Sequence, residues 1–282
     1  MKIYKTISEF QNWRISQTNQ TIGFVPTMGA LHQGHLSLIK QTKKQCDITV
    51  VSIFVNQLQF GPNEDFDQYP RTLEEDLNCL NNEKIDVLFL PSSIEMYNKN
   101  FNFQVYENQI SKKLEGKSRP KFFNGVTTIV SKLFNIVQPT HAFFGEKDIQ
   151  QLYIIKKMVL DLNYNIKICG CPTIRNNLGL ALSSRNKHLS SNEKKQAVIL
   201  YDALKLGKRL IQEGEKYTSI HEAMMNKIKS YSKIQIDYLS IANLENFEEL
   251  KNNIPKADIV ISGAIYINTI RLIDNITILK HA

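Results

Sequence analysis

The chain contains 282 residues, of which 42% are hydrophobic and 22% charged, so its composition excludes a disordered chain and its length suits two compact cores. Its net charge of +8 is spread evenly: residues 1–176 carry 20 basic and 16 acidic side chains, and residues 177–282 carry 15 and 11. Because no basic arm or stripe stands out, we expect anionic small molecules as partners and no nucleic acid.

The first residues and the cysteines indicate the cellular compartment. Residues 1–10 lack the apolar core of a signal peptide, and no apolar run reaches the roughly 18 residues that a membrane span requires. The four cysteines, Cys46, Cys79, Cys169 and Cys171, form no CxxC pair and are expected to remain free thiols. We therefore expect a soluble, cytoplasmic protein without a membrane partner.

The run PTMGALHQGHLSLI at residues 26–39 is the most informative segment. Residues 21–25 are apolar enough for a buried parallel strand, and a helix is expected after Gly34. His32 then lies in the turn and His35 near the helix start. Because the first N–H groups of a helix have no partner within it, they favour an anion, and two imidazoles beside them could bind a polyphosphate.

Other interpretations of this His-x-x-His pair are weaker. A zinc site would need further ligands, and no Cys or His cluster at ligand spacing follows. Histidines that only pack would not explain Gly29 and Gly34, which let the backbone turn sharply and approach a ligand. HxGH is shared by adenylyl- and cytidylyl-transferring enzymes and by one class of aminoacyl-tRNA synthetases, so the motif alone leaves the reaction open.

Strands and helices alternate in the first part of the chain. Strands are predicted at residues 21–25, 47–55, 87–90, 142–145 and 166–170, and helices at residues 73–84, 126–137 and 149–162. Apolar strands with crossover helices predict an α/β fold with a doubly wound, parallel, Rossmann-like sheet, whose ligands bind beyond the carboxyl ends of the strands. His32, Asn56 and Lys147 each follow a predicted strand end.

The pattern changes after Asn186. Ser190 and Glu193 have the spacing of a capping box before a helix that runs to about residue 212, and a second helix is predicted at residues 219–231. Strands are predicted at residues 234–242, 259–267 and 270–279. We therefore expect two domains, residues 1–176 as a Rossmann-like ligand-binding domain and residues 177–282 as a smaller α+β lid, with the site at their junction.

Five sequence blocks in chain order carry a resemblance to a known family. After PTMGALHQGHLSLI come VSIFVNQLQFGPNEDFDQYPRT, GVTTIVSKLFNIVQP, FFGEKDIQQL, and PTIR followed by GLALSSRN. Together they resemble the pantothenate synthetases, which are pantoate–β-alanine ligases. The resemblance implies an ATP-dependent carbon–nitrogen ligase that condenses pantoate with β-alanine through a pantoyl adenylate and releases AMP and pyrophosphate.

The resemblance also implies how ATP is held. His35 matches the proton donor of the family, and His32 and Lys147 are expected to act with it on the phosphates, where charge develops in the transition state. Two simpler roles are the alternatives to phosphate binding. Lys147 could form an ion pair with a neighbouring carboxylate, and the SSR segment at residues 183–185 could be a helix cap. The expected ATP-binding residues are Met28, Gly29, Ala30, Leu31, His32, Gln33, Gly34, His35, Gly145, Glu146, Lys147, Asp148, Ile174, Leu182, Ser183, Ser184 and Arg185.

Amide side chains are expected at the acyl site. An amide both donates and accepts, so Gln59 and Gln151 suit a hydroxylated carboxylate. In the family the matching glutamines bind pantoate, and the first also meets β-alanine. Asn56 and Met28 are expected to line the same pocket, and Arg119 is a candidate for a carboxylate.

Four positions depart from the family pattern. Gln57 replaces a usual proline, Phe122 a histidine, Leu178 an aspartate and Leu182 a methionine. None of them removes a proposed phosphate or pantoate ligand. Phe122 puts in doubt how a carboxylate near Arg119 is oriented. Leu178 puts in doubt how the hinge to the second domain is held in place.

Mg²⁺ is implied by the triphosphate, and a homodimer by the family. Glu75 and Asp76 are candidate metal ligands, although an acidic, solvated helix face is the simpler interpretation, so the ligands stay unassigned. Two rival functions remain. A pantetheine-phosphate adenylyltransferase would share HxGH without needing the paired glutamines, and a tRNA-charging protein would need an RNA-binding domain or a basic face after Asn186.

Overall fold

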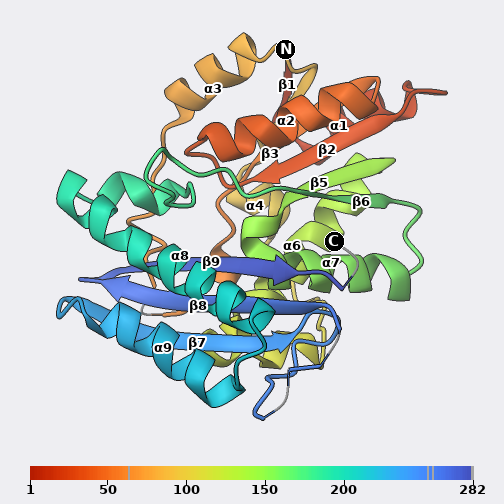
Figure 1. Cartoon of the computed structure of the whole chain (residues 1–282). Coiled ribbons are helices and arrows are strands. Elements are labelled where there is room, and N and C mark those ends of the chain that lie inside the picture. Colours follow the sequence, from red (N-terminus) through yellow and green to blue (C-terminus); the bar gives the residue numbers. More distant parts are fainter. Residues whose placement is uncertain (63, 253, 256, 281–282) are drawn as a thin grey trace. The chain divides into compact units, whose positions relative to one another are not determined.

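The computed structural model describes residues 1–62, 64–252, 254–255 and 257–280 (Figure 1). The chain divides into two compact units. The first comprises Met1–Glu107, Lys121–Glu146 and Gln151–Ile174. The second comprises Asn108–Pro120, Lys147–Gln150 and the chain from Arg175 onward. Two short stretches from outside the C-terminal part of the chain therefore belong to the second unit.

Parallel strands form the sheet of the first unit, in the order β1-β4-β3-β2-β5-β6. β3 is buried along its whole length, as expected for an apolar strand covered on both faces. The strands are β1 (Lys2–Tyr4), β2 (Ile22–Thr27), β3 (Ile48–Ile53), β4 (Val87–Phe89), β5 (His141–Gly145) and β6 (Lys167–Cys171).

Helices cover both faces of this sheet. Leu88 of β4 packs in a buried cluster with Ile39 of α2 and Leu80 of α3, whereas the next residue, Phe89, contacts Phe10 of α1 with 5.0 Å between ring centroids. Because successive side chains of a strand point to opposite faces, α1 lies on the face opposite α2 and α3, and α6 packs with α1. The helices are α1 (Ile7–Ile15), α2 (Gln33–Gln45), α3 (Leu73–Asn82), α4 (Ser93–Met96), α6 (Phe122–Val137) and α7 (Ile149–Asp161), with the first two residues of α7 in the second unit.

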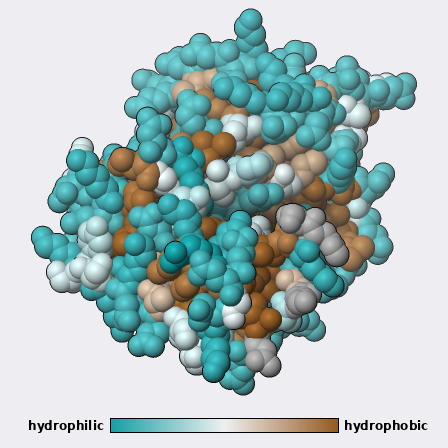
Figure 2. All heavy atoms as spheres, viewed as in Figure 1, coloured by the Kyte–Doolittle hydropathy of each residue, from teal (hydrophilic) through white to brown (hydrophobic). Residues whose placement is uncertain are grey.

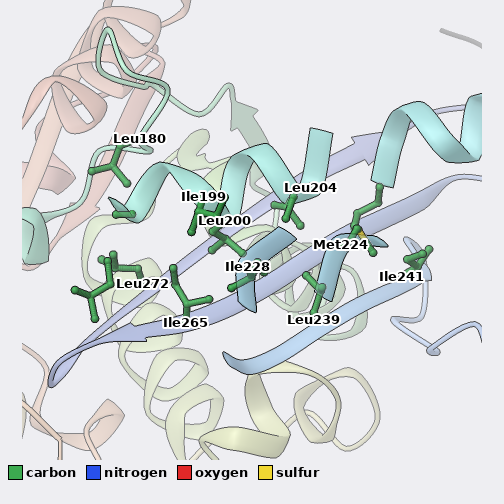
Figure 3. Packing of buried hydrophobic residues seen from close by; sticks show 14 of the residues in the cluster. Leu180, Ile199, Leu200, Leu204, Met224, Ile228, Leu239, Ile241, Ile265 and Leu272 are labelled. Carbon is green, nitrogen blue, oxygen red and sulfur yellow. The ribbon is translucent and has the colours of Figure 1, made fainter. Parts of the chain in front are cut away.

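The second unit is built on an antiparallel sheet in the order β7-β8-β9. Its strands are β7 (Ile234–Asn243), β8 (Ile259–Ile267) and β9 (Ile270–Ile278), and its long helices are α8 (Ser191–Gln212) and α9 (Tyr217–Lys229). Leu200 and Leu204 of α8 and Met224 of α9 pack with Leu239 and Ile265 of the sheet (Figure 3). Burial of each such side chain contributes about 1.5–3 kcal/mol to stability, so this cluster supplies a core of its own.

An ionic network attaches the stretch Asn108–Pro120, which contains α5 (Glu115–Ser118), to this sheet. Arg271 of β9 donates to both carboxylate oxygens of Glu115, at 2.6 and 2.9 Å, and to Asp237 of β7 at 2.6 Å. The two carboxylates raise the pKa of Arg271 despite its burial. A buried ion pair is costly unless its partners are fully hydrogen-bonded, and this bidentate arrangement provides those bonds.

The predicted fold class is confirmed, with local differences at the ends of elements. β8 has the predicted bounds, and the capping box of Ser190 and Glu193 begins α8 as predicted. α6 begins at Phe122 rather than at residue 126, and β1 was not predicted. Hydrophilic residues dominate the face drawn in Figure 2. Within the part of the chain that the structure describes, no helix combines the length and apolarity needed to cross a membrane.

Candidate active site

The strand order places the switch point of the first unit's sheet between β2 and β5. From β2 the chain proceeds to β3 and β4 on one side, whereas β5 and β6 lie on the other. Ligands of open α/β sheets bind beyond the carboxyl ends of the strands at such a point. The HxGH loop follows β2, and Gly145 is the last residue of β5. Two of the sequence blocks expected to hold ATP thus start at the switch point.

His32 and His35 lie side by side at the start of α2, with 4.1 Å between their ring centroids. His32 is the N-cap, and its Nδ1 accepts a hydrogen bond from the Gly34 N–H at 3.1 Å. In a neutral imidazole the proton is then on Nε2, so His32 carries a donor at Nε2. A Cβ on Gly34 would lie 2.8 Å from the ring of His32. Gly34 therefore makes room for an imidazole, where the sequence suggested room for a ligand.

Asp76 holds the loop that precedes these histidines. Its carboxylate accepts hydrogen bonds from the backbone N–H groups of Ala30 at 2.9 Å and Leu31 at 2.7 Å. Ala30 has a φ of 49°, unusual for a residue with a side chain, and Gly29 has a φ of 78°. Because Asp76 is only 2% exposed, this carboxylate stabilises an unfavourable backbone conformation from inside the protein. In the sequence alone, Asp76 was a candidate metal ligand, and its role in holding this loop was not predicted.

Asn56 is the centre of a buried amide network in the first unit. Its Nδ2 donates to the Gly125 carbonyl and to Gln59 Oε1, both at 3.0 Å. Its Oδ1 accepts a 2.6 Å hydrogen bond from the hydroxyl of Tyr97. Gln59 Nε2 in turn lies 3.2 Å from the sulfur of Met28. The network brings together the predicted Met28, Asn56 and Gln59, and adds Tyr97, which the sequence analysis did not select.

Glycine at position 125 lets α6 approach this network closely. A Cβ there would lie 2.3 Å from the carbonyl oxygen of Leu58 and 2.4 Å from the backbone nitrogen of Gln59. Both atoms belong to the backbone of the short 3-10 helix η1 (Gln57–Gln59), so neither can move aside as a flexible side chain would. Gly125 thus fixes the distance between α6 and the glutamine.

Lys147 belongs to the second unit and to the 3-10 helix η3 (Glu146–Asp148). Its Nζ lies 3.4 Å from the Asp148 carboxylate, so the predicted alternative of a local ion pair is present. A long, partly exposed pair of this kind contributes little to stability, and a phosphate could replace it. The backbone carbonyl of Lys147 accepts a 2.8 Å hydrogen bond from the amide of Asn275 on β9.

Of the two adjacent glutamines at the start of α7, one is used to build the second unit. Gln150 is buried, accepts from the Glu115 N–H at 3.1 Å, and donates to the carbonyls of Ile110 and Lys113, each at 2.8 Å. Gln151 lies half-buried in the first unit. The structure thus separates a structural glutamine from the predicted pantoate ligand.

The serine–arginine segment lies in the second unit and caps a short helix. Ser183 is the N-cap of the 3-10 helix η4 (Ser184–His188), and its hydroxyl accepts from the Arg185 N–H at 3.3 Å. Ser184 is buried, whereas Leu182 and Arg185 are half-buried. The segment therefore forms a helix cap, as the alternative interpretation expected. Because the cap uses the Ser183 hydroxyl, a phosphate role stays open for the side chains of Ser184 and Arg185.

The structure shows the local surroundings of three of the departures from the family pattern. Asn176 stabilises the turn before the serine–arginine segment. Its Oδ1 accepts hydrogen bonds from the N–H groups of Leu178 and Leu180, each at 3.0 Å, so this turn needs no aspartate at position 178. Gln57 is exposed at the start of η1. Arg119 lies 3.3 Å from the Glu115 carboxylate, which orients it without a histidine at position 122.

The described residues contain no group of three or more His, Cys, Asp or Glu side chains able to hold a metal ion. Asp76, one of the two candidate ligands, has both carboxylate oxygens bound to backbone N–H groups. The four cysteines are free, and burial raises the pKa of the Cys46 and Cys171 thiols to about 11, which keeps them protonated and unreactive.

Comparisons with known proteins agree on one family. The family model described as Pantoate-beta-alanine ligase matches residues 2–277. The chain is 48% identical to the pantothenate synthetase of Caldicellulosiruptor saccharolyticus over 266 residues, 94% of each protein. It is 47% identical to that of Thermosipho africanus over 282 residues, 99% of this chain and 100% of that protein.

Solved structures give the same result. The pantothenate synthetase from Thermus thermophilus matches with a TM-score of 0.91 and 39% identity, covering 98% of this chain and 99% of that one. The pantoate-beta-alanine ligase from Francisella tularensis, complexed with beta-gamma ATP and beta-alanine, matches with a TM-score of 0.82 and 40% identity, covering 100% of this chain and 98% of that one.

Proposed function

Because the chain belongs to the pantoate-beta-alanine ligase family, we propose that its two histidines and its amide network carry out the condensation through a pantoyl adenylate. The enzyme joins pantoate to β-alanine and uses ATP. The family match spans residues 2–277, so an adenylyltransferase of another substrate is not favoured. The observation that carries the residue-level proposal is the pair of imidazoles at the switch-point end of β2.

The first step is attack of a pantoate carboxylate oxygen on the α-phosphorus of ATP. The new bond is carboxylate oxygen to phosphorus, the bond to the bridging oxygen breaks, and pyrophosphate leaves. His35 is the proton donor to the phosphoryl oxygens as negative charge moves onto the pyrophosphate, and the Nε2–H of His32 supports it. Preorganised donors at the place where charge develops lower the barrier of such a step.

The second step is attack of the β-alanine amine on the acyl carbon. The carbon–nitrogen bond forms, AMP leaves with the oxygen that joined it to the acyl group, and the amine loses a proton. Gln59 and Gln151 hold pantoate through hydrogen bonds, and Gln59 also meets β-alanine. The buried bonds of Asn56 to Gln59 and Gly125 support this role, because they hold the Gln59 amide in one orientation.

The remaining ATP ligands come from loops and helix starts. In this proposal, Lys147 exchanges its ion pair with Asp148 for a phosphate, and the hydroxyl of Ser184 and the guanidinium of Arg185 bind the β- and γ-phosphates. The backbone from Met28 to Gln33, Gly145, Glu146, Asp148, Ile174, Leu182 and Ser183 completes the ATP site. Mg²⁺ would accompany ATP and would supply charge neutralisation at the phosphate oxygens, next to the phosphate-binding residues named above.

The organisation of the enzyme completes the proposal. Residues 1–176 bind ATP and pantoate, residues 177–282 serve as a lid, and the protein is a cytoplasmic homodimer. Exchange of labelled pyrophosphate into ATP tests the adenylate: it should require pantoate and proceed without β-alanine. Exchange that is independent of pantoate would refute the intermediate, and sedimentation equilibrium tests the dimer.

A further inference from the structure

The donor and acceptor atoms of the buried amide network can be assigned from a single atom. The Gly125 carbonyl oxygen can only accept, so the Asn56 atom 3.0 Å from it must be the donor Nδ2. That same Nδ2 lies 3.0 Å from the Gln59 side chain, which must therefore turn its acceptor Oε1 toward it. The Gln59 NH₂ group is then on the opposite side of the amide, beside Met28.

Tyr97 holds the other end of this network. With Nδ2 directed at Gly125 and Gln59, the Oδ1 of Asn56 faces the Tyr97 hydroxyl at 2.6 Å, so the phenol must donate. Burial raises the pKa of Tyr97, which keeps that proton in place. The ring is fixed between Phe54 and Phe101, with centroids 5.9 and 4.9 Å away. A fixed donor thus holds the Oδ1 side of the Asn56 amide, while the Gly125 carbonyl holds its Nδ2 side.

We propose that Tyr97 is a positioning residue for the condensation: through Asn56 it makes Gln59 present its NH₂ group, as a donor, to an acceptor oxygen of pantoate. The inference rests on the proposed function of Gln59 and extends it by assigning the direction of the hydrogen bond. Without the phenol, Asn56 Oδ1 keeps only a long 3.4 Å bond from the Leu58 N–H, so the amide is held mainly by its two Nδ2 bonds. Gln59 is then held less firmly in the orientation that presents its NH₂ group.

Tyr97→Phe removes the hydroxyl and keeps the ring in place. In pantoate-dependent pyrophosphate exchange it should raise the KM for pantoate about tenfold, the effect of losing one buried hydrogen bond of about 1.4 kcal/mol, with the KM for ATP nearly unchanged. Tyr164→Phe is the matched control, because it removes a 2.6 Å bond between a tyrosine hydroxyl and Ser131 in the same unit. It should leave both KM values unchanged. A merely structural role of Tyr97 would move stability or both KM values together.

A double-mutant cycle separates the inference from the proposed function. In a Gln59→Ala background, Tyr97→Phe should no longer raise the KM for pantoate, because the group through which it acts is gone. An additive effect would overturn the inference and leave the role of Gln59 intact. If Gln59→Ala alone does not raise the KM for pantoate, the proposed role of Gln59 fails and the inference fails with it.

Gln59→Glu tests the direction of the hydrogen bond itself. Glutamate keeps an oxygen toward Asn56 and places a second, negatively charged acceptor where the NH₂ group lies. The KM for pantoate should then rise above that of Gln59→Ala, because two acceptors face each other. A Gln59→Glu enzyme that binds pantoate better than Gln59→Ala would overturn the assigned direction.

Discussion

Replacing Asp76 by asparagine should unfold the HxGH loop from within the first unit. The carboxylate accepts from Ala30 and Leu31 at 2.9 and 2.7 Å, and hydrogen bonds to a charged group contribute about 1.5–3 kcal/mol each. An asparagine can keep one of these bonds with its oxygen, but its NH₂ group then faces the second backbone N–H. We therefore expect a loss of about 2–3 kcal/mol in the free energy of unfolding.

At roughly 2–4 °C of Tm per kcal/mol for a unit of this size, the loss corresponds to a Tm lowered by roughly 4–12 °C. The assay is thermal unfolding of the protein in EDTA and without ATP, so that neither metal nor nucleotide contributes. Glu74→Gln is the control, because it removes one exposed carboxylate from the same first turn of α3. It should change the Tm by no more than a surface substitution does.

The result that would refute this reasoning is equally specific. If Asp76→Asn has the Tm of Glu74→Gln in EDTA, and its activity is restored by raising the Mg²⁺ concentration, Asp76 acts on the metal and not on the loop. Our expectation is the reverse. The Tm should fall without metal, and added Mg²⁺ should not restore the KM for ATP, because the loop conformation has been lost.

Four further substitutions test the site. His35→Ala should lower the kcat of pyrophosphate exchange by about 10²–10³ with little change in the KM for ATP. An equal loss in the rate of amide formation from synthetic pantoyl adenylate and β-alanine would contradict a role confined to adenylation. Gln151→Ala should raise the KM for pantoate, while Gln150→Ala should lower the Tm and leave that KM nearly unchanged. A large loss of ATP affinity in Gln151→Ala would show that Gln151 is not the pantoate ligand. Gly125→Ala should destabilise the protein by about 1–3 kcal/mol, measured by urea unfolding, and a stable variant would mean that η1 can move away from the added carbon.

Much of the fold was predictable because its long elements have strong local patterns. β3 and β8 consist mostly of apolar residues, and α8 starts at a capping box that is visible in the sequence. β1 was missed because it has three residues at the sheet edge, two of them exposed, and so carries no pattern. The start of α6 at Phe122 has no capping side chain to mark it.

The site was predictable where chemistry and spacing coincide, and not where a contact joins distant residues. The HxGH run gives two histidines at the start of a helix, and the structure brings their rings together. Asp76 lies 46 residues after Ala30, and nothing near either residue indicates that they bond. Tyr97 likewise reaches Asn56 across 41 residues. Such partners are selected by the packing of the whole sheet.

The composition of the second unit has a consequence for synthesis on the ribosome. Glu115 is made early, but the guanidinium that pairs with both of its oxygens follows 156 residues later, on the last strand. Contacts of such high sequence separation form slowly, and a nascent chain can make this one only after the segment that contains β9 has left the exit tunnel. The stretch Asn108–Pro120 therefore cannot take its final position until β9 emerges. Until then the carboxylate of Glu115, which is buried in the folded protein, remains exposed to water. A ribosome that stalls before Arg271 would hold a chain whose first sheet is complete and whose second unit cannot close.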